Sequence, residues 1–149
     1  MGDRTTVRLE IGGSVTQAEW LELLKLLESG GAQNDEDGYT IRSNKPPTFI
    51  EGQSFTVFFD ECNYGEAPDE ILEWLDEHRL PYKHSWEAGG GYGPGAHIVL
   101  PGQPWISYGT LDYEPAMPIY EIEKHLKDGT LEQQLALFKT DIPPFKVTE

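Results

Sequence analysis

The sequence contains little cysteine, few basic residues and no long hydrophobic run. Cys62 is the only cysteine in 149 residues, which excludes an intramolecular disulfide and fits a reducing cytoplasm. No apolar run approaches the roughly 20 residues of a membrane-spanning helix, and the first residues lack the apolar core of a secretory signal. We therefore expect a cytoplasmic protein that does not enter a membrane.

Basic residues are outnumbered by acidic ones. The chain holds 11 Lys and Arg against 26 Asp and Glu, which gives a formal net charge of −15 at pH 7. Nucleic-acid backbones and anionic membranes repel such a surface, so we expect direct binding to neither. A basic protein is the partner that this charge favours. High acidity also keeps a protein soluble, so the charge alone does not establish a partner.

Established catalytic and cofactor motifs are also missing. The glycine-rich stretch 89–95 lacks the Lys-Ser/Thr pair of a phosphate-binding loop, and a strand-like segment follows it instead of a helix. We therefore expect no cofactor. The glycines and Pro94 favour a hairpin turn. The alternative is a mobile flap whose Tyr92 stacks on a ligand or partner.

Hydrophobic periodicity predicts six strands and four helices in a single domain spanning residues 1–149. Apolar alternation and short apolar runs predict strands at 5–13, 39–43, 54–61, 82–88, 96–102 and 104–113. Helical spacing predicts helices at 16–29, 68–80, 118–129 and 130–139, before an extended tail. In the third of these strands Phe55, Val57 and Phe59 point one way and Phe58 the other, which indicates that both faces are covered there.

The order of these elements predicts an α+β fold of the ferredoxin-like kind. A β-α-β-β-α-β antiparallel sheet would carry two helices on one face, extended by a hairpin strand and short C-terminal helices. The second face of the sheet would expose Phe58 and Val99. Either the terminal helices or a second copy of the chain would cover it.

Cys62 is a weak candidate nucleophile. It follows a predicted strand and precedes a predicted helix, whose N-terminus would lower the thiol pKa, and His84 or His97 would be its base. The acids Asp60 and Glu61 oppose a thiolate at this position. A single cysteine commonly serves as a small packing residue. We therefore favour a protein without catalysis.

The predicted hairpin also places His84 and His97 on neighbouring strands. Together with Glu87 they would offer two imidazoles and a carboxylate to a divalent metal. Two ordinary cross-strand polar residues are the simpler interpretation. We therefore predict no metal site.

The first two helices carry much of the acidity. Glu19 and Glu22 project from the first, and the second carries Asp69, Glu70, Glu73, Asp76 and Glu77. Because both helices lie on one side of the predicted sheet, their outer faces form one acidic field. This field is either a solvated surface or a decoy whose carboxylates imitate the phosphates of DNA.

These observations favour a small, non-catalytic binding or accessory protein whose partner is a basic protein or a second copy of the chain. Its aromatic anchors would be Tyr92, Trp86 and Trp105, and its steering carboxylates would be Glu73, Asp76 and Glu77. Three alternatives remain open. They are a small-molecule binder or enzyme with a pocket beneath residues 89–95, an acidic DNA mimic directed against a defence system, and a structural homodimer joined through the second sheet face.

Overall fold

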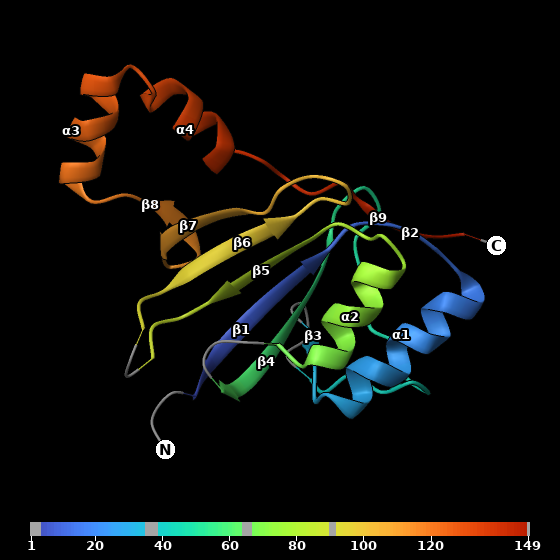
Figure 1. The fold of residues 1–149 in the computed structure, drawn as a ribbon. Helices are drawn as coiled ribbons and strands as arrows, with labels where there is room; N and C mark the ends of the chain where they lie inside the picture. Colours follow the sequence, from blue (N-terminus) through green and yellow to red (C-terminus); the bar gives the residue numbers. More distant parts are fainter. Residues whose placement is uncertain (1–3, 35–38, 64–66, 90–91, 149) are drawn as a thin grey trace.

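One large antiparallel sheet carries two helices on one of its faces, and two further helices lie beyond its far edge (Figure 1). The computed structural model describes residues 4–34, 39–63, 67–89 and 92–148. The protein is therefore of the α+β class, as its sequence predicts.

Thirteen elements make up the described part of the chain. The large sheet contains β1 (Arg4–Ile11), β3 (Gln33–Asn34), β4 (Phe55–Asn63), β5 (Tyr82–Trp86), β6 (Gly95–Val99), β7 (Ile106–Leu111) and β8 (Glu114–Ala116). A small parallel sheet pairs β2 (Gly13–Thr16) with β9 (Phe145–Thr148). The helices are α1 (Gln17–Ser29), α2 (Asp69–Glu77), α3 (Ile119–Asp128) and α4 (Leu131–Phe138).

β1 lies inside the large sheet, whose strand order is β3-β4-β1-β5-β6-β7-β8. Its Val7, Leu9 and Ile11 are completely buried in the core that α1 and α2 cover. The alternating residues Arg8 and Glu10 stand on the opposite face, as the period of two requires. Each neighbouring pair of strands is antiparallel.

Local chemistry explains where α1 and α2 begin. Thr16 and Glu19 form a capping box: each side chain accepts a hydrogen bond from the backbone amide of the other residue. Pro68 precedes α2, where its missing amide donor is not needed. Both helices then bury an apolar stripe, formed by Trp20, Leu23, Leu24 and Leu27 in α1 and by Ile71, Trp74 and Leu75 in α2.

Four aromatic rings join the two ends of the chain to the core. Trp20, Phe49, Phe55 and Phe145 lie with all their ring centroids 5.2–5.7 Å apart. They come from α1, the segment before β4, β4 itself and β9. This packing holds the C-terminal strand beside β2, although 132 positions separate Gly13 from its partner Phe145.

The second face of the sheet is covered only in part. Ala96, Ile98 and Tyr108 form a small buried cluster. Phe138, the last residue of α4, and Ile142, which follows that helix, pack against it. Tyr113, in the turn between β7 and β8, packs against Phe58 and lies over the Arg8 guanidinium. The helices α3 and α4 themselves contain no buried residue.

The predicted strand at 39–43 was wrong. This segment forms only isolated bridges, through Thr40 and Arg42, and the strand beside β4 is β3. Two prolines, Pro46 and Pro47, follow the segment and cannot donate backbone hydrogen bonds to a ladder.

The predicted exposure of Val99 on the second face was also wrong. Val99 pairs with Tyr82 and lies in the core on the helix side. In this strand Ile98 and Val99 are adjacent apolar residues that are buried on opposite faces. The sequence pattern therefore does not indicate which residue faces the helices. Covering of the second face by the terminal helices is limited to Phe138.

Gly12, between β1 and β2, provides a test of how closely the C-terminal segment packs against the start of the chain. A Cβ at position 12 would overlap the carbonyl oxygen of Pro143, and backbone cannot move aside cheaply. We expect Gly12→Ala to lower the free energy of unfolding by about 2 kcal/mol. Urea unfolding measures this. Gly93→Ala is the matched control, because a Cβ there meets no atom within 4 Å. Equal midpoints for the two variants would contradict the close approach.

Candidate protein-binding surface

Two tryptophans and a histidine form an aromatic patch on the helix side of β5 to β7. The aromatic patch consists of Trp86, His97 and Trp105. The His97 and Trp105 rings are stacked, with centroids 4.7 Å apart, and Trp86 lies 5.6 Å from His97. Trp105 is 60% exposed. The structure thus brings two of the three predicted aromatic anchors together through a histidine that lies between them.

Strand register explains how the aromatic patch forms. His84 pairs with His97 directly across β5 and β6, as the hairpin predicts, and their ring centroids are 4.9 Å apart. Trp86 pairs with Gly95, and its indole lies over that glycine, where a Cβ would come within 2.7 Å of the ring. The Trp86 Nε1–H also donates to the carbonyl oxygen of Gly93, 3.0 Å away. The glycine-rich segment therefore makes room for a tryptophan.

Tyr92, the third predicted anchor, packs on the glycine-rich segment. Its ring packs against Gly89, whose backbone amide donates to the Tyr92 carbonyl oxygen. A Cβ at position 89 would come within 2.5 Å of that ring. The expected flap includes residues 90–91, which lie outside the described residues. Here too a glycine leaves room for an aromatic side chain.

His84 is a buried structural residue. Its Nε2 accepts a hydrogen bond from the Ala67 amide at 3.0 Å, so the neutral ring carries its proton on Nδ1. Burial, and then the neighbouring His97, lowers the pKa of His84 from 6.5 to about 3. The ring stays neutral at physiological pH, and one of its two nitrogens is already used to hold the start of α2.

The environment of Cys62 disfavours a nucleophile. Burial, followed by the charge of Asp60, raises the pKa of the thiol to about 11, whereas a helix N-terminus was expected to lower it. Cys62 packs against the main core as a partly buried side chain. It therefore fits the packing interpretation.

A metal site at His84 and His97 would also lack its carboxylate. Glu87 lies on the opposite face, where its carboxylate accepts a hydrogen bond from the hydroxyl of Tyr113. The burial of Tyr113, and then the charge of Glu87, raise the pKa of Tyr113 to about 12. Within the described ranges, no group of three or more His, Cys, Asp and Glu side chains is arranged to hold a metal ion.

Helix α2 presents an acidic face beside the aromatic patch. The acidic face consists of the exposed Asp69, Glu70, Glu73, Asp76 and Glu77. The α1 acids are less free: Glu22 accepts from the Trp74 indole at 3.3 Å, and Glu19 and Glu22 lie 3.7 and 3.9 Å from the ring of His78. Of the two helices that cover the sheet, α2 therefore carries more exposed acidic side chains than α1.

The acidic face and the aromatic patch meet in a hollow of about 180 Å³. Asp76 at the end of α2 and Arg79 just after it line one side, Trp105 just before β7 lines another, and residues 100–103 complete the lining. Sequence reasoning missed Arg79, which has a left-handed backbone with φ 54°, and its Nη2 points toward Gly102. It also missed that Asp76 accepts a hydrogen bond from the buried Tyr82 hydroxyl.

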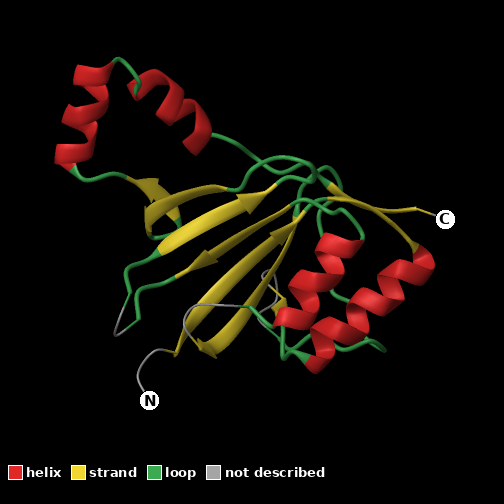
Figure 2. Ribbon diagram, viewed as in Figure 1, coloured by secondary structure: helices red, strands yellow, loops and turns green. Residues whose placement is uncertain are grey.

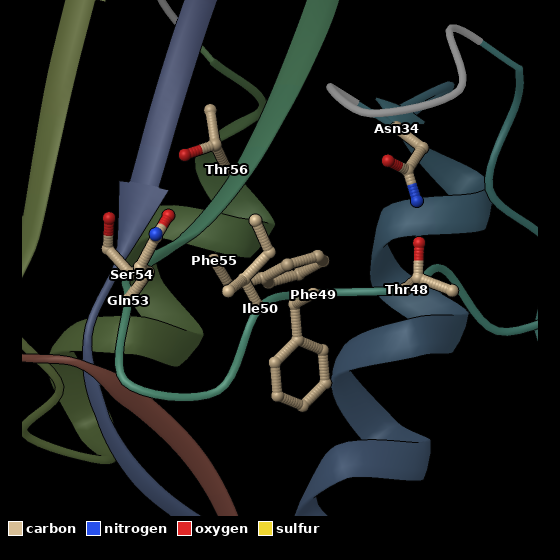
Figure 3. Close-up of a pocket in the computed structure, with 8 residues that line it drawn as sticks. All are labelled: Asn34, Thr48, Phe49, Ile50, Gln53, Ser54, Phe55 and Thr56. Carbon is tan, nitrogen blue, oxygen red and sulfur yellow. The ribbon is translucent and has the colours of Figure 1, made fainter.

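A second, smaller hollow suits a ligand less well. This hollow, drawn in Figure 3, lies between the end of α1 and the start of β4, where Asn34, Thr48, Phe49 and Phe55 surround it. Its volume is about 60 Å³, which accommodates water but no larger ligand.

Comparisons with protein-family models, curated proteins and solved structures find no match for this chain. No helix within the described residues combines the length and apolar character needed to cross a membrane.

The burial of neutral His84 predicts a pH-dependent stability. The unfolded chain binds a proton at His84 near pH 6.5 and the folded chain does so only near pH 3, so stability falls as pH drops below about 6.5. Between the two pKa values, the free energy of unfolding changes by about 1.4 kcal/mol per pH unit for this one proton. We expect His84→Gln to reduce the slope of the unfolding free energy between pH 6.5 and 5.

The matched control is His125→Gln, at a partly exposed histidine in α3. Urea titrations at four pH values compare both variants with the parent. A parent slope that His84→Gln leaves unchanged would contradict the assignment.

Proposed function

We propose that this chain is a non-catalytic binding protein that contacts a basic protein through the acidic face and the aromatic patch together. The observation that carries the proposal is the hollow in which Asp76 and Trp105 face the same space. A partner that fills it meets the Asp76 carboxylate and the Trp105 indole, with the Arg79 guanidinium beside them.

Electrostatics support a basic partner. The chain carries a net charge of −15, and the acidic face contributes five exposed carboxylates on one short helix. Such a field speeds and orients the encounter with a positively charged surface, more than it holds the final complex. A lysine or arginine side chain has the chemistry to pair with Asp76 and to stack on Trp105.

The aromatic patch supplies the apolar anchor. Trp105 is a large side chain that is 60% exposed, and His97 supports one face of its ring. Exposed tryptophans held in place by neighbours are typical energetic centres of protein interfaces. The raised thiol pKa of Cys62 and the occupied Nε2 of His84 favour binding over nucleophilic catalysis.

We also infer a ferredoxin-like arrangement for the unit from β1 to β5. Its four strands follow the order β3-β4-β1-β5, all antiparallel, and both of its helices lie on one face. In this interpretation β6 to β8 extend the sheet past the helices. The same extension exposes the aromatic patch.

A pull-down from a lysate of the source organism, with this protein as tagged bait, tests the proposed surface. We expect one basic partner to be recovered at about 50 mM salt and lost near 500 mM, because salt screens exposed charges. Binding should fall more than about 10-fold with Glu73→Lys/Glu77→Lys and with Trp105→Ala. Calorimetry with the purified partner measures both losses. Asp76 is left intact because it bonds Tyr82.

Glu51→Lys/Asp141→Lys is the matched control, since it makes the same charge change at two exposed residues outside the acidic face and the aromatic patch. A partner that binds all variants equally, or that binds independently of salt, would contradict the proposal. If the partner is a DNA-binding protein and duplex DNA competes with the bait, the acidic face acts as a DNA mimic.

A further inference from the structure

The helices α3 and α4 form an arm, residues 119–139, most of whose large apolar side chains are exposed, although Phe138 packs against the sheet. Figure 2 shows both helices beyond the β8 edge, far from the helices that cover the sheet. Neither helix contains a buried residue. The exposed apolar residues include Ile119, Tyr120, Leu126, Leu135 and Leu137, which are 42–75% exposed. Soluble monomers rarely leave such a set of large apolar residues in water.

The arm also carries an apolar socket. A hollow of about 310 Å³ lies between the arm and the strand that leads into it. Only apolar residues line it: Pro115, Met117, Ile122, Leu131, Leu135 and Phe138. The most exposed arm residues, Ile119, Tyr120 and Leu126, are not among them. The same element therefore presents projecting apolar side chains and a receptive apolar hollow, which is what a self-complementary interface requires.

Charge distinguishes the arm from the rest of the molecule. It holds four acids (Glu121, Glu123, Asp128 and Glu132) and three bases (Lys124, Lys127 and Lys139), a net charge of −1. The remainder of the chain carries −14. The parts of two chains outside their arms repel each other. A basic partner is attracted to that acidic part and not to the nearly neutral arm. The arm is thus a surface on which a second −15 chain can dock with little repulsion.

We propose that the arm is a dimerisation surface, in which projecting side chains such as Leu126 of one copy enter the apolar socket of a second copy. The interface is isologous, so each arm provides both the projecting residues and the socket. The acidic face and the aromatic patch lie elsewhere on the molecule and stay open.

Light scattering during gel filtration tests this proposal. We expect a mass twice the 16.8 kDa of the chain, with the dimer kept or strengthened at high salt because salt screens the repulsion between the bodies. Leu126→Glu and Leu135→Glu should each raise the dissociation constant at least about 10-fold, because a charge enters an apolar contact. Both side chains are exposed in the single chain, so thermal unfolding of the diluted variants should show an intact fold.

Leu21→Glu is the matched control, since Leu21 is 52% exposed on α1 and remote from the arm. It should remain dimeric. A mass of 16.8 kDa up to about 1 mM protein, the range of very weak association, overturns the proposal. So does a dimer that survives both arm variants. The opposite salt responses keep this test separate from that of the acidic face.

Discussion

The pairing of β1 with β4 and β5 is the constraint on which the rest of the structure depends. Val7, Leu9 and Ile11 are wholly buried between these strands and the two covering helices. A slip of one residue would turn all three to the opposite face, so the register is strongly specified. That register sets His84 opposite Leu9, and β5 in turn sets His97 opposite His84. The location of the aromatic patch therefore follows from the burial of an aliphatic strand.

The two proposed binding surfaces arise because the sheet is wider than the two helices that cover it. Two helices, α1 and α2, cover one face of a seven-stranded sheet, and the strands beyond β5 extend past them. On the helix side of β6, Trp105 stacks on the half-buried His97 and is itself 60% exposed, while the chain continues into an arm beyond β8. Both regions contain large apolar groups, which a chain of this length could otherwise bury. The two proposed contacts with other molecules would account for these exposed groups.

Sequence reasoning succeeded where the signal is local. The helices predicted at 16–29 and 68–80 rest on spacings of three and four residues, and both are confirmed as α1 and α2. It failed where partners are distant or the pattern has no phase. β3 is two residues long, and Val99 belongs to a run that is apolar on both faces. The pairing of His84 with His97 was predictable from one hairpin, but the hollow beside Trp105 required the C-terminal end of α2 to reach the 100–103 turn.

The distribution of charge makes the two proposed contacts compatible. A chain with −15 charges self-associates poorly through its body, so an apolar contact between copies has to lie where charge is nearly balanced and far from the rest. The arm meets both conditions, since it carries −1 and stands beyond the sheet edge. A dimer formed there doubles the acidic faces that a basic partner meets, which increases avidity without any new contact. Under both proposals, the nearly neutral arm would hold a second copy of the chain while the acidic face stays free for a basic partner.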